Sequence, residues 1–538
     1  MATAIPGAAV RARARAATRG RAAAAEALPA AIAIAALDFL LALYLDLHLH
    51  YTVGDALSRV ANAFGVLYGR DPHLAAIGFI WNPLPSLLDV PILLFVHLWP
   101  PLAQDGVAGL IVTAAFSGIA VYYLVALLGR FSVPWGWRVS LALLFAANPM
   151  VALYSANGMS DMMLAGALLA VVHYTLGYLE DNSLGDLVAA GVWLAIAFGV
   201  RYEAGPLGIC LAFGLFVALR RQHRRAREVR GAVLILLAPL FYAAAIWVYL
   251  NWLIMKNPLY FLNGNYSNNA QTSLQGNIGA VAGASHHILH ALLLVGQMGL
   301  LFWPVFLGLA AAAAIALRRR GNPSAWILIG ATVGMPLLQA ALLYLGHSGG
   351  WARYFIYYIP NGVLLLAFAA AQLPGRRLRG AALVLVAVLC VLGDIGTYHE
   401  EVTSPVVGLG ETSVVQELSA NRPLHLLTAD DQVVRYLDAH PHLSVLVDAF
   451  RGFPIELRLA HPAQLIITPD VNFQSVLENP LGRVDAILVP APQNLGLLDA
   501  VNRTWPKLWA GKMAWVHLLK EFPGPDDWRL YAVGPNAP

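Results

Sequence analysis

The feature that most constrains this chain is a series of long apolar segments separated by short clusters of arginine. A helix needs about 20 consecutive apolar residues to cross the hydrocarbon core of a membrane. Such stretches recur from residue 28 to residue 398. Only 12% of all residues are charged, so much of the surface must face something other than water. The sequence therefore predicts a polytopic α-helical membrane protein.

About eleven segments have the length and composition of a membrane-spanning helix. They are residues 28–49, 105–128, 135–155, 159–178, 185–201, 205–220, 231–255, 290–316, 324–345, 354–372 and 380–398.

The arginine clusters predict the orientation. If an N-terminal basic arm (residues 1–27) is cytoplasmic, the clusters Arg220 to Arg230 and Arg376 to Arg379 fall on the same side. This distribution follows the positive-inside rule. A transit peptide is the alternative for the stretch Arg11 to Arg21, which is rich in arginine and has no acids, and we favour the cytoplasmic arm. We predict a protein of the cell (plasma) membrane, and the net charge of +4 does not suggest a nucleic-acid partner.

Two of the predicted outer segments are long. Residues 50–102 begin with a stretch whose apolar side chains repeat at helical spacing, and continue into an apolar stretch broken by prolines 83, 85 and 91. Proline disrupts helix interiors, so this loop is expected to form helices lying on the membrane surface. Residues 257–290 are rich in Asn, Gly and Ser and are expected to form a flexible loop.

The pattern changes after Tyr398. Short runs at 443–449, 464–470, 485–492 and 528–533 have the composition of strands and alternate with helical stretches. The sequence predicts a C-terminal extracytoplasmic α/β domain, residues 399–538, with a mostly parallel sheet. It contains no phosphate-binding or nucleophile motif, so acceptor binding or a structural role is expected.

Charged residues are scarce on the predicted outer side, which makes each one a candidate for function. Asp55 follows the first span directly and is a candidate general base, with helix capping as the alternative. Asp161 begins the fourth span, where capping is again the alternative. Arg201 and Glu203 lie where the fifth span ends, and a pair of loop charges is the simpler interpretation.

Further candidate residues on the outer side come later in the chain. Arg353 and Tyr354 begin the tenth span, His347 precedes them, and Lys256 follows the seventh. An arginine fork fits phosphate oxygens, so these residues are candidates for binding a lipid-linked phosphate.

Several of these stretches, in this order, give the chain a resemblance to the GT-C superfamily of polyprenyl-phosphate-sugar glycosyltransferases. The similar branches are the protein O-mannosyltransferases, the aminoarabinose transferases and the arabinosyltransferases. The resemblance spans residues 28–372, which would form the membrane domain within 28–398. It rests on the acid after the first span and on WNPLPSLL (81–88), SANGMSD (155–161), LAIAFGVRYEAG (194–205), NWLIMKNPLYF (251–261) and GGWARYFIYYIP (349–360).

The resemblance implies an inverting single displacement. Asp55 would deprotonate the acceptor hydroxyl, and Arg353, with Arg201, would stabilise the leaving polyprenyl phosphate. Many relatives carry two adjacent acids, whereas Asp55 stands between Gly54 and Ala56, so Asp161 is the candidate for the second carboxylate. The implied partners are a polyprenyl-phosphate sugar, membrane lipids and a glycan, lipid or protein acceptor. No metal or other cofactor is expected.

Two other classes of function remain open at this point. A membrane transporter would show internal repeats and discontinuous helices, and no repeat between the two halves is evident. A non-catalytic relative would keep the fold and use the C-terminal domain to bind a partner.

Overall fold

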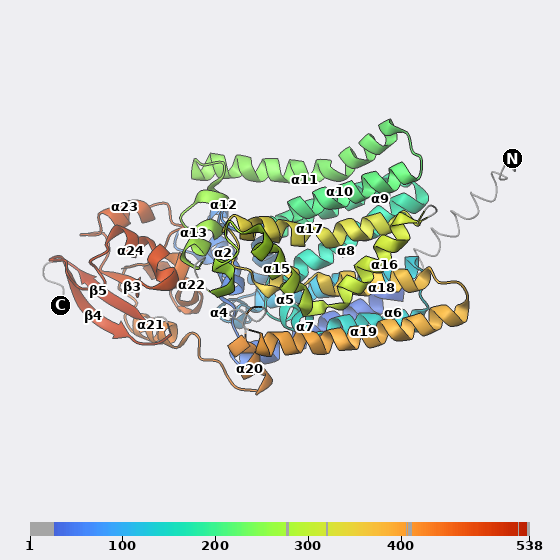
Figure 1. Cartoon of the computed structure of the whole chain (residues 1–538). Coiled ribbons are helices and arrows are strands. Elements are labelled where there is room, and N and C mark those ends of the chain that lie inside the picture. The colour runs from blue at the N-terminus through green and yellow to red at the C-terminus, as the bar shows by residue number, and fades with distance from the viewer. Residues whose placement is uncertain are drawn as a thin grey trace. The chain divides into compact units, whose positions relative to one another are not determined.

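Every segment predicted to cross the membrane is helical in the computed structural model of this protein (Figure 1). The structure describes residues 26–275, 279–318, 321–404, 406, 412–525 and 527–534. Most of the predicted basic arm, residues 1–27, lies outside the described residues, as do Arg319 and Arg320.

Within the described ranges, eight helices are long and apolar enough to cross a membrane. They are Glu26–His48, α5 (Val107–Arg130), α8 (Asp161–Asp181), α10 (Ala204–Arg221), α11 (Ala226–Met255), α17 (Ser324–Tyr344), the stretch Ala352–Ala371 that ends in α18 (Tyr358–Ala371), and α19 (Arg376–Thr403). The chain is a mostly helical integral membrane protein, as predicted.

Two further predicted spans are bent rather than straight. Helices α6 (Trp135–Ala147) and α7 (Pro149–Ser155) meet at 75°, and the stretch Ile288–Phe302, which begins with α15 (Ile288–Met298), meets α16 (Pro304–Leu317) at 102°. A proline is the first residue of the second helix in each pair. The backbone N–H at this position makes no hydrogen bond within the helix, so proline, which lacks this N–H, is tolerated there.

Counting each bent pair as one span gives ten candidate spans in the described residues. The remaining predicted span is α9 (Leu184–Val200), an apolar helix of 17 residues. The structure thus contains a helix or a bent pair for each of the predicted segments, and supports eight to ten spans where about eleven were expected.

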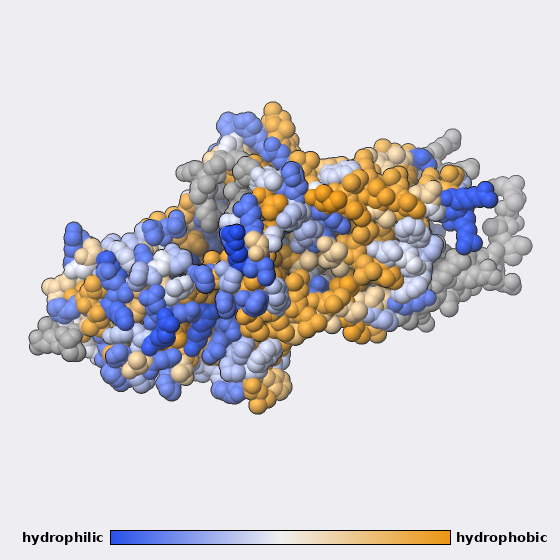
Figure 2. Space-filling model, turned by 90° about the horizontal axis from the view of Figure 1, so that it is seen from below, coloured by the Kyte–Doolittle hydropathy of each residue, from blue (hydrophilic) through white to orange (hydrophobic). Residues whose placement is uncertain are grey.

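The exposed surface of the long helices is largely apolar, as the orange side chains in Figure 2 show. On α11, for example, Leu234, Phe241 and Tyr242 are all more than half exposed. A soluble protein rarely exposes apolar patches of this extent, whereas lipid tails solvate them.

The residues group into two compact units, each discontinuous in sequence. We call Met1–Ala42, Thr113–Trp247 and Ile278–Ala420 the helical unit, and Leu43–Val112, Val248–Asn277 and Asn421–Pro538 the sheet unit. The sheet unit therefore combines C-terminal residues with parts of both predicted outer loops.

Helices α10 and α17 of the helical unit approach closely through glycine. A Cβ atom added to Gly330 would lie 2.7 Å from the carbonyl oxygen of Cys210, and one added to Gly214 would collide with the carbonyl oxygen of Trp326. Small residues at helix contacts let backbones pack closely, which drives helix association in membranes.

Gly330→Ala is therefore expected to loosen the α10–α17 contact and lower the free energy of unfolding by about 1–3 kcal/mol. Gly231→Ala is the matched control, because an added Cβ meets no atom within 4 Å at that position. Apparent unfolding temperatures in detergent compare the two variants. Equal values would contradict the close packing.

The first predicted outer loop is largely helical and belongs to the sheet unit. It contains α2 (Gly54–Tyr68), α3 (Leu84–Leu93) and α4 (Pro101–Gln104). The loop expected to be flexible also carries short helices where it is described: α12 (Tyr260–Asn263), α13 (Asn268–Gln275) and α14 (Gly279–Ala282).

The described C-terminal residues form a five-stranded sheet in the order β2-β1-β3-β5-β4. The strands are β1 (Val445–Leu446), β2 (Leu465–Ile466), β3 (Ala486–Pro490), β4 (Val516–Phe522) and β5 (Trp528–Val533). The helices around it are α21 (Thr428–Asp438), α22 (Ala449–Arg458), α23 (Phe473–Glu478) and α24 (Ala500–Thr504), and α20 (Thr412–Ser419) belongs to the helical unit.

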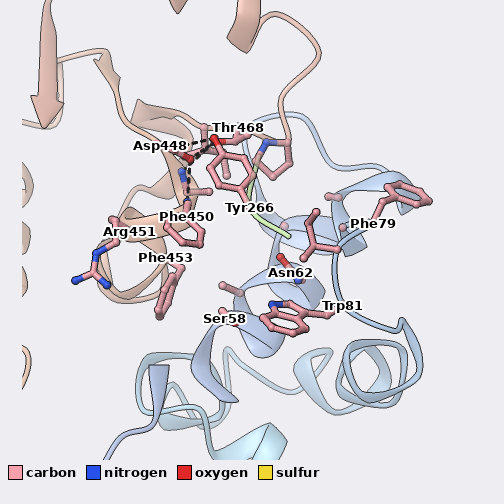
Figure 3. Close-up of a pocket in the computed structure, with 18 of the residues that line it drawn as sticks. Ser58, Asn62, Phe79, Trp81, Tyr266, Asp448, Phe450, Arg451, Phe453 and Thr468 are labelled. Carbon is pink, nitrogen blue, oxygen red and sulfur yellow. Dashed lines mark hydrogen bonds between the residues drawn. The ribbon is translucent and has the colours of Figure 1, made fainter. Parts of the chain in front are cut away.

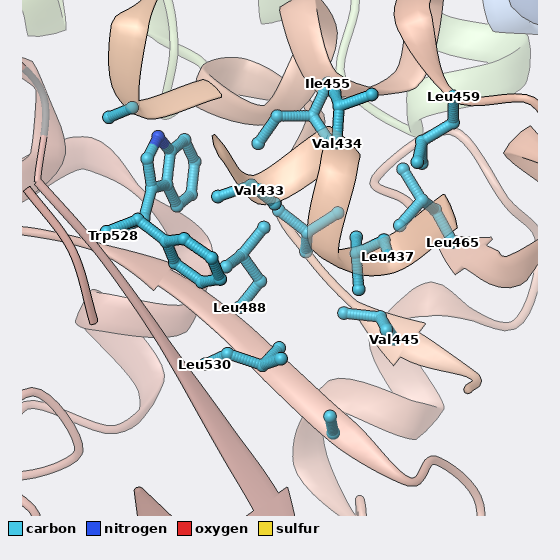
Figure 4. Close-up of a cluster of buried hydrophobic side chains, with 14 of the residues drawn as sticks. Val433, Val434, Leu437, Val445, Ile455, Leu459, Leu465, Leu488, Trp528 and Leu530 are labelled. Atoms are coloured by element: carbon cyan, nitrogen blue, oxygen red, sulfur yellow. The ribbon is translucent and has the colours of Figure 1, made fainter. Parts of the chain in front are cut away.

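Helices cover both faces of the sheet. Successive strand residues point to opposite faces, so Val445 and Leu488 pack with α21 and α22, as Figure 4 shows, while Leu446 and Ile487 pack with α23 and α24. Strands buried on both faces read as continuous apolar runs, which is why β1 and β3 could be predicted.

Two features of the sheet differ from expectation. Its β2-β1-β3 half is parallel, but β5 is antiparallel to both β3 and β4, so the sheet is mixed rather than mostly parallel. Strand β4 was not predicted, because most of its residues are exposed or only partly buried and lack an apolar run.

Candidate functional site

Helix α2 presents a polar face to a cavity in the sheet unit. Asp55, Ser58 and Asn62 are spaced by three and four residues, which places them on one side of a helix. All three line the cavity. Val53, not Asp55, is the N-cap residue, and no side-chain capping hydrogen bond is present there. Asp55 therefore lies in the first turn, where the helix dipole favours a negative charge.

The cavity has a volume of about 350 Å³. Its walls come from α2, the following loop, the end of α11, the α12–α13 segment, α22 and the end of β2. Figure 3 shows Trp81 beside Ser58 and Asn62, with Tyr266 and Phe450 on the opposite side. The walls are mainly aromatic and aliphatic with a few polar groups, as in most sites for small organic ligands.

A buried charge supports the Trp81 wall. The guanidinium of Arg59, one turn after Asp55, lies 5.8 Å from the centre of the Trp81 ring. The buried carboxyl of Asp89 interacts electrostatically with Arg59, while burial raises the pKa of that carboxyl well above its usual range. Arg59 thus holds the Trp81 ring in place by a cation–π contact.

Asp448 organises the opposite wall. It follows β1 and is fully buried, and its carboxylate accepts hydrogen bonds from the Thr468 hydroxyl (2.5 Å), the Tyr266 hydroxyl (2.8 Å) and the backbone N–H groups of Phe450 (2.9 Å) and Ala500 (2.6 Å). Figure 3 shows part of this network. A buried carboxylate with four donors is fully satisfied, so Asp448 holds Tyr266 in place rather than acting on a ligand.

Tyr266 also stacks on Phe450, with ring centres 4.9 Å apart. Sequence analysis did not identify Asp448, Tyr266 or Thr468 as site residues. One feature of the sequence could have indicated Asp448, because this acid comes directly after a buried parallel strand. Ligand sites of α/β sheets lie at the carboxyl ends of the strands.

A second cluster of charged residues lies in the helical unit, around Arg201. One terminal nitrogen of Arg201 donates to Asp161 Oδ1 at 2.9 Å, and the other donates to Glu203 Oε1 at 2.6 Å. The Arg201 and Asp161 side chains are 12% and 2% exposed, so the ion pair is largely removed from water. Asp161 therefore binds an arginine, and Ser160, the N-cap of α8, makes no side-chain capping hydrogen bond.

These contacts set the charge states of the cluster. Burial alone would raise the pKa of Glu203, but the charge and hydrogen bonds of Arg201 outweigh it, so this pKa is lower than usual. Burial would lower the pKa of Arg201, and the adjacent Asp161 and Glu203 carboxylates raise it instead. Glu203 and Arg201 are therefore both charged near neutral pH.

Arg353 completes this cluster. Its guanidinium lies 5.7 Å from the centre of the Tyr354 ring, and the guanidinium of Arg201 lies 5.5 Å from the same centre. Arg353 also lies 5.5 Å from the Trp351 ring centre, and its charge contributes to lowering the pKa of Glu203. Two guanidinium groups therefore lie against one aromatic ring, and the planar fork of a guanidinium fits phosphate oxygens.

Two predicted site residues have other positions. Lys256 is exposed, and its ammonium donates to the carbonyl oxygen of Leu253 at the end of α11 (2.9 Å). It does not line the described cavity. His347 is an exposed residue of the loop after α17.

The structure thus brings together Asp161, Arg201, Glu203, Arg353 and Tyr354 in the helical unit, whereas Asp55 lines the cavity of the sheet unit. In the described part of the chain, no three His, Cys, Asp or Glu side chains are grouped so as to hold a metal ion.

Residues 94–249 match a family model described as dolichyl-phosphate-mannose-protein mannosyltransferase. The matched residues include Asp161, Arg201 and Glu203 but not Asp55 or Arg353. It confirms the resemblance to the GT-C superfamily over these residues. The matched family is one of glycosyltransferases, so the predicted enzyme class is confirmed at the level of the family. A sequence search among curated proteins finds no match.

Two solved structures are similar to this chain. The archaeal oligosaccharyltransferase AglB from Archaeoglobus fulgidus, in complex with an inhibitory peptide and a dolichol-phosphate, is 12% identical, with 86% of this chain and 69% of that chain covered and a TM-score of 0.45. ArnT from Cupriavidus metallidurans in the apo state is 14% identical, with 94% and 97% covered and a TM-score of 0.44. Similarities this low say nothing about substrate.

Proposed function

We propose that this protein transfers a sugar from a polyprenyl-phosphate donor to a hydroxyl group of an acceptor. The observation that carries the proposal is the position of Asp55, a carboxylate in the first turn of α2 that lines a cavity of about 350 Å³. The family match over residues 94–249 supports the reaction class.

The proposed reaction is a single displacement with inversion. Asp55 takes the proton of the acceptor hydroxyl, and the acceptor oxygen attacks the anomeric carbon of the donor sugar. The bond between this carbon and the phosphate oxygen breaks, and polyprenyl phosphate leaves with the electron pair. Asp55 then releases its proton to water, so the enzyme returns to its starting state.

We assign the stabilisation of the leaving phosphate to Arg353, because developing negative charge is stabilised by fixed cations. The donors of Arg201 are directed at Asp161 and Glu203. Arg201 therefore contributes mainly by neutralising these carboxylates and fixing Tyr354 next to Arg353. Asp161 is the partner of Arg201 in an ion pair and is not required as a second base.

We further propose that the protein resides in the plasma membrane with a cytoplasmic N-terminus, so that transfer takes place on the outer face. The distribution of arginine clusters in the sequence supports this orientation.

Purified protein reconstituted in vesicles tests the reaction and the orientation together. A panel of radiolabelled polyprenyl-phosphate sugars is supplied with a mixture of glycan, lipid and peptide acceptors. We expect release of polyprenyl phosphate and label in one acceptor class, only where the C-terminal residues face the acceptor. Transfer from nucleotide sugars instead, or transfer in the opposite orientation, would contradict the proposal.

A further inference from the structure

The cavity of the sheet unit has the mixture of surfaces that binds a sugar ring. Trp81 and Phe450 offer aromatic faces on opposite sides, as Figure 3 shows, and these can pack against the C–H groups of a pyranose or furanose ring. Ser58 and Asn62 offer polar groups along one edge. A few placed polar groups among aromatic walls are the usual source of orientation and specificity in small-ligand sites.

Glu456 is a further polar group of this cavity, and the proposed reaction does not use it. It lies on α22, lines the cavity and is only 3% exposed. Its Oε1 atom is buried and has no hydrogen-bond partner among the residues described here. A buried polar atom without a partner is costly in a native protein and is explained when a ligand supplies the partner.

The environment of Glu456 determines whether it donates or accepts. Burial, and to a smaller extent the charge of Asp470, raises the pKa of Glu456 to about 8. A carboxyl group with this pKa carries its proton at neutral pH and can donate a hydrogen bond.

Other charged or titratable groups surround α22. Asp448, Arg451 and Arg458 lie at the ends of this helix, and Arg458 is paired with Asp105 and Asp431. The remaining groups on segments packed against α22, or next to the cavity or Asp470, are Asp55, Arg59, Tyr68, Arg70, Asp71, His73, Tyr260, Tyr266, Asp430, Arg435, Tyr436, Asp438 and His461.

We propose that this cavity binds an uncharged sugar ring of the acceptor, and that Glu456 donates a hydrogen bond to one of its hydroxyl groups. The inference rests on the proposed function, because it identifies the acceptor of that reaction as a carbohydrate. Asp55 lines the same cavity, so an anionic sugar would meet like charge and bind less tightly.

Equilibrium binding of glycosides to the full chain in lipid nanodiscs tests the proposed sugar site without requiring sugar transfer. The probes are p-nitrophenyl α-mannoside, an uncharged glycoside, and p-nitrophenyl α-mannuronide, its anionic counterpart. We expect the mannoside to bind about 10-fold more tightly than the mannuronide at neutral pH. Equal affinities, or displacement of the mannoside by farnesol or a peptide alone, would overturn the assignment to an uncharged sugar.

The role of Glu456 is tested by two substitutions. Glu456→Ala is expected to weaken mannoside binding about 5- to 10-fold, because one hydrogen bond is lost. Wild-type binding is expected to weaken by a similar factor between about pH 6 and about pH 9, as Glu456 loses its proton, while Glu456→Gln keeps a donor and shows no such dependence. Glu478→Gln, at an exposed residue of α23, is the matched control and behaves as wild type.

A third variant covers the outcome in which Glu456→Ala does not fold. A Cβ on Gly65 would lie 3.9 Å from Glu456 Oε1 and 3.5 Å from the Ala76 Cβ, which are ordinary contacts. Gly65→Ala is thus expected to fold and to weaken mannoside binding several-fold by narrowing the cavity beside Glu456. Unchanged affinity in both Gly65→Ala and Glu456→Ala would overturn the inference.

The inference and the proposed function can fail separately. Mannoside binding that depends on Glu456, without sugar transfer from any donor, would contradict the enzymatic function and leave the sugar site intact. Transfer to an acceptor without a sugar ring, with no glycoside binding, would contradict the inference alone.

Discussion

Replacing Arg201 with methionine is expected to destabilise the helical unit by about 3–5 kcal/mol, because it leaves two carboxylates without their cation. Asp161 is 2% exposed, and Glu203 is 16% exposed. Both lie near the ends of apolar helices, where water is scarce. Removal of one partner from a buried ion pair costs far more than the intact pair contributes.

The apparent unfolding temperature of the full chain in nanodiscs measures this effect. The matched control is a triple variant, Arg201→Met with Asp161→Asn and Glu203→Gln, which keeps the shapes and removes all three charges. It is expected to recover much of the lost stability. A single variant as stable as wild type, or a triple variant no better than the single one, would show that the cluster is not a buried ion pair.

The same variants separate stability from function. The triple variant keeps Arg353 but lacks the guanidinium of Arg201, which also contacts the Tyr354 ring. We therefore expect donor binding to stay weaker than in wild type even where the fold is restored. A matched variant of Lys256, Lys256→Met, removes an exposed cation outside the cluster and is expected to leave donor binding unchanged.

Much of the helical fold could be predicted because the bilayer imposes a length on every span. Bends were harder to predict. At Asn148 and Pro149, inside the segment predicted as one span, the chain turns by 75° and the Asn148 side chain accepts hydrogen bonds from the N–H groups of Met150 and Val151. A hydropathy profile does not detect a local side-chain hydrogen bond of this kind.

The C-terminal sheet was predictable only in part. Strands β1 and β3 lie between layers of helices, and their apolar runs revealed them. Strand β4 lies at the edge of the sheet, and charged residues such as Lys520 and Glu521 interrupt its apolar character. Charges on an edge strand protect it from pairing with another chain. They also interrupt the apolar pattern from which a strand is predicted.

The sequence indicated the charged residues of the helical unit but only part of their pairing. Arg201 and Glu203 were recognised because charges are scarce on the predicted outer side, and Tyr202 alone separates them, so a pair of loop charges was one interpretation. Asp161 lies far away in sequence, so its ion pair with Arg201 required the fold. Glu456 was not identified from the sequence, because its burial is a property of the packed chain.

Asp55→Asn is expected to lower the rate of sugar transfer by about 100- to 10,000-fold, which is the usual contribution of a general base. Asparagine keeps the shape of the side chain but cannot take the proton of the acceptor. Donor binding is expected to stay within a few-fold of wild type, because the groups assigned to the phosphate are in the helical unit.

Asp71→Asn provides the matched control for this substitution. Asp71 is an exposed carboxylate on the loop that follows α2, and it does not line the cavity. Its variant is expected to transfer sugar at the wild-type rate. A loss of activity in both variants would point to a general loss of negative charge rather than to a base.

The most direct test of this account is the single-turnover rate of sugar transfer at saturating polyprenyl-phosphate sugar, measured for wild type, Asp55→Asn and Asp71→Asn with donor affinity determined in parallel. The account predicts at least about a 100-fold slower rate for Asp55→Asn alone, with donor affinity retained. Transfer by Asp55→Asn at the wild-type rate would contradict the role of Asp55 as the base.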